Sequence, residues 1–256
     1  MKKQDTSWGN VAEWYDELLE TDNDSYQKNV ILPNVLRILN IKKGTRIADL
    51  ACGQGFFSRQ FADAGAEVTA TDASAELIEF AKKRSKDVAY DVAPADDLHI
   101  LKSESFDVVC IILAIQNIQN IAGTFAESSR VLASDGKLVL VMNHPAFRIP
   151  KRSSWGWDAK LGAQYRRVDG YLTESKILID MHPGKEDKQT TISFHRPLQT
   201  YVNMLAKHGF AVTRMEEWIS HRQSQKGPRQ EAEDRIRKEV PLFLMIEAVK
   251  LPASSQ

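Results

Sequence analysis

The stretch from residue 46 to residue 57, RIADLACGQGFF, constrains the fold more than any other part of this chain. It begins as an apolar strand, continues into a loop that holds Gly53 and Gly55, and leads directly into a helical pattern over residues 58–64. Glycine has no Cβ, so it permits a positive φ and lets the backbone approach a ligand closely. The N–H groups at the start of the helix attract a negative group. A strand, a glycine turn and a helix predict the first half of a nucleotide-binding βαβ unit.

The second half of that unit follows in the expected order. Gly65 is placed to end the helix, and residues 66–72 have the pattern of a second strand that ends in Asp72. An acid at this strand tip can accept hydrogen bonds from both hydroxyls of a ribose. Two glycines alone are a weak signal, but strand, loop, helix, strand and acid in this order are a much more specific one.

The position of Asp49 bears on which nucleotide is bound. A dinucleotide site has the pattern G-x-G-x-x-G, and Ser58 stands here where the third glycine would be. Asp49 lies at the end of the first strand, where its carboxylate would repel a pyrophosphate but could orient an ammonium group. The pattern therefore favours a ligand with an amino-acid end and an adenosine end.

The run from Asp49 to Gly55 resembles motif I of the class I S-adenosylmethionine-dependent methyltransferases. The family usually has glycine at the position of Ala51, so this copy is a variant. The resemblance continues over residues 42–142 and implies S-adenosyl-L-methionine as cofactor and S-adenosyl-L-homocysteine as product. An NAD-binding turn or a purely structural Rossmann turn remains the alternative.

The resemblance also implies which residues bind the cofactor. The third strand is expected at residues 88–92, and Asp96 after it best matches the acid that meets the adenine amino group, whereas Asp97 could be a surface turn. An aromatic residue near Tyr15 would cover the methionine end, or else simply pack its helix on the sheet. Residues 105–113 resemble motif IV, and either Gln116 or Asn117 after them could touch cofactor or substrate. The full set implied is Tyr15, Asp49, Ala51, Cys52, Gly53, Gly55, Phe56, Asp72, Ala73, Ala95, Asp96, Asp97, Ala114 and Ile115.

The fold expected from these patterns is a single α/β domain over residues 1–256, a Rossmann-like three-layer sandwich. Its sheet is expected to have seven strands, mostly parallel, with an antiparallel last strand. A helical pattern at the N-terminus contains Pro33, which predicts a kink or a break into two helices. The expected parts are an N-terminal helical lid (1–40), a cofactor-binding core (42–142), a substrate-lid insertion after the fifth strand (143–197), and a final helix and strands (198–250).

The insertion carries the candidate substrate contacts. Residues 176–182 and 188–195 predict a β-hairpin, with turn residues at 183–187 between them. Loops inserted over strand tips usually select the substrate, and one rich in Trp, Tyr, Arg and His suits an aromatic or anionic small molecule. The alternative is that these side chains only fold the lid. The candidate substrate residues are Asn143, His144, Arg166 and Tyr171.

Methyl transfer by this family needs mostly positioning, and a base only where the acceptor atom is protonated. His144 is the candidate base, because the ordinary pKa of histidine is about 6.5 and the residue follows a strand at its carboxyl end. It could equally be a structural histidine that holds the loop. His182 and His195 are weaker candidates.

Composition narrows the class of partner. Lys+Arg and Asp+Glu both number 34, so the formal net charge is zero. An RNA or protein methyltransferase with the same cofactor would be expected to show a basic face or an added module, and neither is apparent. We therefore expect a small-molecule acceptor and no nucleic acid. The polar stretch 223–239 is compatible with a solvated arm or with the surface of a homo-oligomer.

Two cysteines, Cys52 and Cys110, fit a reducing compartment and are too few for a metal site of their own. No apolar run approaches ~18 residues, so no membrane span is expected, and residues 1–5 do not begin a secretion signal. These features lead us to expect a cytoplasmic protein without a metal.

Overall fold

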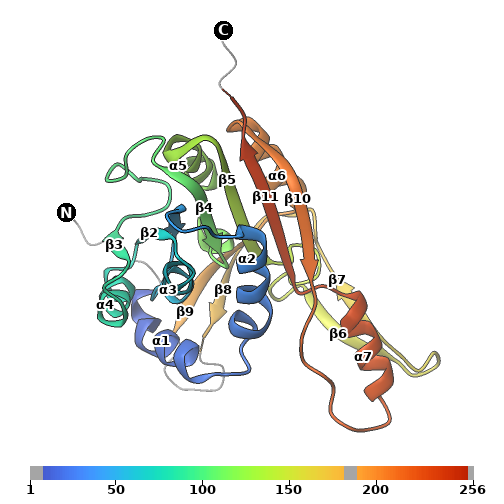
Figure 1. Cartoon of the computed structure of the whole chain (residues 1–256). Helices are drawn as coiled ribbons and strands as arrows, with labels where there is room; N and C mark the ends of the chain where they lie inside the picture. The colour runs from blue at the N-terminus through green and yellow to red at the C-terminus, as the bar shows by residue number, and fades with distance from the viewer. Residues whose placement is uncertain (1–7, 182–188, 253–256) are drawn as a thin grey trace.

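The computed structural model describes residues 8–181 and 189–252, and a seven-stranded sheet runs through its centre (Figure 1). The strand order is β10-β11-β5-β4-β1-β2-β3. Strands β3, β2, β1, β4 and β5 run parallel, β11 is antiparallel to both β5 and β10, and the predicted mostly parallel sheet is thereby confirmed. The bounds are β1 Arg46–Leu50, β2 Glu67–Asp72, β3 Ala89–Val92, β4 Phe106–Ile112, β5 Leu132–Asn143, β10 Phe210–Trp218 and β11 Phe243–Lys250.

Helices cover both faces of this sheet, because strand side chains alternate between the two faces. In β1, Ile47 packs in the core shared with helices α2, α3 and α4, whereas Ala48 and Leu50 pack in the core shared with α5 and α6. The result is the expected three-layer sandwich. The helices are α1 Ala12–Thr21, α2 Leu32–Leu39, α3 Phe56–Asp63, α4 Ala75–Arg84, α5 Ile121–Val131, α6 Leu198–Lys207 and α7 Gln230–Glu239, with short turns η1 Gly9–Val11, η2 Gln27–Ile31 and η3 Ile115–Asn117.

The helical pattern that contains Pro33 divides into two helical elements next to the proline, as predicted. The π-helical turn η2 ends at Ile31, α2 begins at Leu32, and Pro33 lies in the first turn of α2. The loop between α1 and η2 lies further upstream. Proline has no N–H to donate, so the start of a helix, where N–H groups lack partners anyway, is the position that tolerates it.

Residues 134–136, Ser-Asp-Gly, have the sequence of a turn, but they are part of β5. The strand is continuous from Leu132, but its pairing with β4 shifts between Phe106 and Val108, and Asp135 has a φ of 63°. β5 advances five residues, from Leu132 to Lys137, while β4 advances two, so three extra residues bulge out without ending the strand. A turn and a bulge both need a residue with a positive φ, so the same Asp-Gly sequence is compatible with either, and here Asp135 provides it in a bulge.

The insertion after β5 forms two hairpins. One pairs β8 Ser175–Asp180 with β9 Thr190–His195, which confirms the predicted strands, while the predicted turn lies outside the described residues. The other pairs β6 Ser153–Asp158 with β7 Ala163–Val168 and was not predicted. Helix α7 lies beside this second hairpin (Figure 1), and the Arg229 guanidinium is 4.6 Å from the Trp157 ring centroid.

Within the described ranges, none of the helices combines the length and apolar character that crossing a membrane requires.

Candidate functional site

The loop after β1 is shaped by a series of positive φ angles. Ala51 has a φ of 55°, Gly53 of 60° and Gly55 of 78°, and Gly55 is the N-cap of α3. A Cβ at Gly55 would lie 2.4 Å from the Tyr90 hydroxyl, so both backbone conformation and space require glycine there. Ala51 adopts the left-handed conformation without being glycine, which accounts for the family's usual residue at that position.

Asp72 connects this loop to the tip of β2. Its Oδ2 accepts a hydrogen bond from the Gly53 N–H at 2.9 Å, and its Oδ1 accepts one from the Ser74 N–H at 2.8 Å. Burial raises the pKa of Asp72, although these two backbone hydrogen bonds act in the opposite direction. The carboxylate is thus held in one orientation at the carboxyl end of the sheet.

Asp49 lies beneath the loop and is 2% exposed. Its Oδ2 accepts a hydrogen bond of 2.5 Å from the Ser58 hydroxyl on α3. Burial raises the pKa of Asp49 to about 7, and the nearby charge of Asp72 contributes in the same direction. The carboxyl group therefore changes its charge near neutral pH.

A cavity of about 510 Å³, which we call the sheet-edge cavity, opens at the carboxyl ends of β1, β2 and β4. Ligands of open α/β sheets bind at this edge. Asp72 and Asp96 are the charged side chains among the described residues that line it, so it is acidic. Of the predicted cofactor residues, the following line it: Ala51, Cys52, Gly53, Phe56, Asp72, Ala73, Ala95, Asp96 and Ala114.

The other predicted cofactor residues lie elsewhere. Gly55 and Asp49 shape and support the loop, and Ile115 is fully buried in the core formed with α5 and α6. Asp97 is exposed and bonded to His99 at 2.9 Å, and this partner lowers the pKa of Asp97, which fits the surface-turn alternative. Tyr15 belongs to α1, but its side chain lies outside the described part of the structure.

Strand β9 was predicted from the sequence, but its place in the wall of this cavity was not. Ile192 and Phe194 of β9 line the sheet-edge cavity, whereas Thr191 and Ser193 line a second cavity. Because successive side chains of a strand point to opposite sides, β9 forms a wall between the two spaces. The period-two alternation of polar and apolar residues in β9 is the signal that could have predicted this wall.

The second cavity, which we call the hairpin cavity, also measures about 510 Å³. It shares Trp8, Leu113 and Asn117 with the sheet-edge cavity, so the two spaces adjoin. Two predicted substrate residues, Asn143 and Arg166, line it. Its charged lining residues within the described ranges are all basic: Arg148, Lys151 and Arg166.

His144 lines neither cavity, contrary to the arrangement a base would need. Its Nδ1 accepts hydrogen bonds from the Ala146 and Phe147 N–H groups at 3.1 and 3.4 Å. Its Nε2 therefore carries the proton and donates it to Glu217 of β10 at 2.7 Å. Burial lowers the pKa of His144, so the fold favours the neutral ring. This geometry favours the structural alternative, in which His144 holds the loop after β5 against β10.

Tyr171, the remaining predicted substrate residue, also lies outside both cavities. Its hydroxyl accepts a hydrogen bond from the Leu198 N–H at 3.0 Å, and its carbonyl accepts one from His195 at 2.7 Å. The two contacts tie the segment before β8 to the start of α6 and to the end of β9. His195, a weaker candidate base, is occupied by the same contact.

The N-terminal helix α1 is fastened beside the sheet-edge cavity by ion pairs to α3 and α4. Asp16, which is 5% exposed, receives two hydrogen bonds from Arg84 of α4, the shorter at 2.5 Å. Glu20 pairs with Arg59 of α3 at 2.5 Å. These contacts place Leu19 of the same helix in the lining of the cavity.

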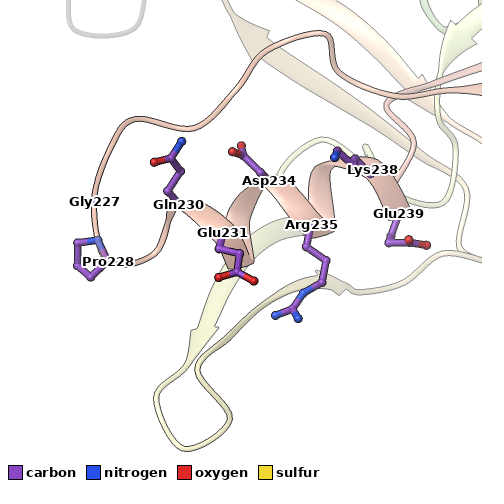
Figure 2. A pocket seen from close by; sticks show the side chains of 8 residues that line it. All are labelled: Gly227, Pro228, Gln230, Glu231, Asp234, Arg235, Lys238 and Glu239. Atoms are coloured by element: carbon purple, nitrogen blue, oxygen red, sulfur yellow. The ribbon is translucent and has the colours of Figure 1, made fainter.

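A third hollow, of about 630 Å³, lies along α7 (Figure 2). Its side chains are mixed charges on the surface of a helix that buries none of its residues, and they extend from the helix without converging. It has neither a buried polar group nor a single sign of charge to select a ligand. Across the described ranges, no group of three or more His, Cys, Asp or Glu residues is arranged to hold a metal ion.

Comparison with known proteins matches the region that builds the sheet-edge cavity. A family model described as a methyltransferase domain matches residues 48–140. A demethylmenaquinone methyltransferase of Renibacterium salmoninarum is 35% identical over 105 residues, which cover 41% of this chain and 44% of that protein. A ubiquinone biosynthesis O-methyltransferase of Xanthomonas oryzae is 30% identical over 128 residues, covering 46% of this chain and 54% of that one. The match thus spans about half the length of these curated relatives.

Among solved structures, an S-adenosylmethionine-dependent methyltransferase from Mesorhizobium loti superimposes with a TM-score of 0.66. It is 27% identical in sequence, and the alignment covers 85% of this chain and 96% of that one. This structural match extends well beyond residues 48–140 and includes most of the sheet.

Proposed function

We propose that this chain, which belongs to the class I S-adenosylmethionine-dependent methyltransferase family, transfers a methyl group from that cofactor to a small-molecule acceptor. The observation that carries the proposal is the pair of adjoining cavities with opposite charge. The acidic sheet-edge cavity suits this cofactor because its sulfonium and ammonium groups are positively charged and its two ribose hydroxyls can donate hydrogen bonds to carboxylates. The acceptor would be an oxygen, nitrogen or carbon atom brought in from the hairpin cavity.

The residues around the sheet-edge cavity suit the cofactor's separate parts. Each oxygen of Asp72 accepts one hydrogen bond from a backbone N–H and can accept another. Asp72 can therefore bind the ribose hydroxyls. Asp96, held by Asn120 at 3.0 Å, fits the adenine amino group. Asp49 lies below the loop and can favour the ammonium of the methionine end. The bound cofactor would supply the electrophilic methyl group.

The chain's own contribution to the reaction is positioning. Asn117 and Leu113 lie at the junction of the two cavities, so the acceptor atom would pass them to reach the methyl group. Holding the two reacting atoms in line, about 3 Å apart, removes much of the entropic barrier to a bimolecular step. The apolar lining supplied by Phe194 and Ile192 would exclude water from that junction.

The relatives named for quinones support a small-molecule acceptor in general. The choice of acceptor does not follow from them, because the hairpin cavity is lined largely by residues after 143, beyond the matched region. We interpret residues 143–197 as the insertion that selects the acceptor. We also propose a cytoplasmic location, because Cys52 and Cys110 are free thiols that fit a reducing compartment.

The first test is calorimetry with S-adenosyl-L-homocysteine and, separately, with NAD. We expect saturable one-to-one binding of S-adenosyl-L-homocysteine and no saturable heat from NAD, because an acidic cavity disfavours a pyrophosphate. A variant Asp97→Asn should bind as the wild type does, since Asp97 is exposed and outside the cavity. Tighter binding of NAD than of S-adenosyl-L-homocysteine would contradict the proposal. Uptake of labelled methyl groups from the cofactor into metabolite pools then identifies the acceptor.

A second test separates stability from catalysis at His144. Replacement His144→Gln should lower the free energy of unfolding by about 1–2 kcal/mol, because one amide cannot replace both sets of hydrogen bonds. The measurement is urea titration at pH 8, with His99→Gln, an exposed histidine, as control. Once an acceptor is known, kcat of the folded variant should stay within about threefold of the wild type. A loss of kcat by 100-fold at unchanged stability would instead restore His144 as the base.

A further inference from the structure

We propose that the methyl acceptor is a small anion whose carboxylate or phosphate group is bound by Arg148 and Arg166 in the hairpin cavity. The inference rests on the proposed function, because it names the chemical class of the molecule that occupies the space next to the cofactor. It goes further by assigning the anchor that holds this molecule, which is distinct from the atom that receives the methyl group.

Arg148 is a half-buried cation with no compensating acid. It lies on the loop after β5, and its guanidinium carbon is 5.1 Å from the centroid of the Phe243 ring. Its side chain makes no hydrogen bond or ion pair with any other residue in the described ranges. Burial lowers the pKa of Arg148, and the charge of Arg166 adds to this effect while Tyr26 opposes it. Natural proteins rarely leave a buried charge unpaired, because desolvation is costly.

Arg166 is oriented toward the same space from β7. Its Nε donates to the Phe147 carbonyl at 2.8 Å, and its Nη2 donates to the Ser153 hydroxyl at 2.7 Å. The guanidinium carbon also lies 4.9 Å from the centroid of the Trp155 ring. These partners are neutral, so they fix the fork of the guanidinium without neutralising its charge. A fixed fork is suited to a carboxylate or phosphate, which it can bind through two parallel hydrogen bonds.

The two arginines repel each other in the absence of a ligand. The hairpin cavity contains no aspartate or glutamate among its described lining residues, and Lys151 adds a third positive charge at its exposed rim. An anion between the arginines would convert this repulsion into two attractive contacts. Gln116 also lines the cavity, and its Oε1 is a buried acceptor without a partner in the described structure. A hydroxyl or amine elsewhere on the same ligand would satisfy it.

The charge pattern also separates the two ligands. A positively charged cofactor is attracted to the acidic sheet-edge cavity and repelled from the basic hairpin cavity, and an anionic acceptor has the opposite preference. The strand β9 presents different residues to each side, so neither ligand has to share a lining with the other apart from the junction.

The experiment measures binding of three probes to the full chain saturated with S-adenosyl-L-homocysteine, by calorimetry. Benzoate and inorganic phosphate are the anionic probes, and benzamide is the neutral counterpart of benzoate. We expect at least one anion to bind at least tenfold more tightly than benzamide, and its affinity to fall at least tenfold in Arg148→Met and in Arg166→Met. Preference for benzoate identifies a carboxylate as the anchored group, and preference for phosphate identifies a phosphate.

Arg167→Met is the matched control. Arg167 is the next residue of the same strand, but it is exposed and paired with Asp169 at 2.8 Å, so anion binding should be unchanged. The Arg148 side chain has no hydrogen bond or ion pair within the described ranges to lose, and methionine keeps an apolar contact with Phe243. Arg148→Met should therefore melt at the same temperature as the wild type or higher, which separates lost binding from lost folding. Arg148→Lys keeps the charge and should retain part of the affinity.

Equal binding of benzoate, phosphate and benzamide, or unchanged anion affinity in both methionine variants, would overturn the inference. These outcomes are distinct from a failure of the proposed function, which would appear as absent binding of S-adenosyl-L-homocysteine before any probe is added.

Discussion

Replacement of Asp72 by asparagine is expected to weaken the binding of S-adenosyl-L-homocysteine by about 100-fold, which corresponds to ~2.7 kcal/mol. Both carboxylate oxygens face backbone N–H donors, from Gly53 and Ser74. An asparagine side chain has one oxygen and one NH₂ group, so its NH₂ group must face one of the two backbone N–H groups, and two donors cannot form a hydrogen bond. The variant therefore loses a backbone contact and the negative charge that favours the ribose hydroxyls, and each loss costs about 1–3 kcal/mol.

Calorimetry at pH 8 measures this change, and the control is Asp97→Asn, which alters an exposed carboxylate after β3, two strands away from β1 and its loop. The control should leave the affinity within twofold of the wild type. An affinity of Asp72→Asn within threefold of the wild type would show that the cofactor does not meet this carboxylate.

Replacement of Asp49 by asparagine is expected to change stability and cofactor affinity in opposite directions. The pKa of Asp49 is raised to about 7 by burial, so the folded protein at pH 8 contains a desolvated carboxylate. A raised pKa means that the contribution of Asp49 to stability is fully present at low pH and is lost as pH rises through about 7. Asparagine stays neutral, keeps an oxygen for the Ser58 hydroxyl, and should raise the free energy of unfolding at pH 8 by about 2–4 kcal/mol.

Urea titrations of the unliganded protein at pH 5 and pH 8 check this result. The advantage of Asp49→Asn at pH 5 should be less than half of that at pH 8, because the wild-type carboxyl is then already protonated in the fold. Asp63→Asn, an exposed carboxylate on α3, should change stability little at either pH. The same Asp49 variant should bind S-adenosyl-L-homocysteine about tenfold more weakly, since it no longer attracts the ammonium group. Lower stability of the variant at pH 8 would contradict the assignment of a costly buried charge.

The nucleotide-binding half of the fold could be predicted because its signals are local. The strand before Asp49, the glycines after it and the acid at residue 72 lie within 30 residues and impose backbone conformations that few other sequences allow. The alternation of strands and helices then limits the sheet to a small number of topologies. Most of the residues expected around the cofactor accordingly line the sheet-edge cavity.

The acceptor side could not be predicted in the same way, because its contacts are long-range. His144 is bonded to Glu217, which lies 73 residues further along the chain, and nothing near His144 in the sequence indicates that partner. Arg148 and Arg166 share the absence of an acid among the described residues that line their cavity, and this absence exists only in three dimensions. The β6–β7 hairpin has no strong turn pattern between its strands, so its Trp and Tyr residues indicated a lid but not its form.

The alternating strand β9 has a consequence for how a protein with the proposed activity can change its acceptor. Substitutions at positions 191 and 193 would reshape the hairpin cavity, where we propose that the acceptor binds, while positions 192 and 194 line the sheet-edge cavity. New acceptor preferences can therefore arise without rebuilding the donor side, through point changes at every second residue of a single β-strand. A shift of that strand by one residue would exchange the two sets and present isoleucine and phenylalanine to the arginines.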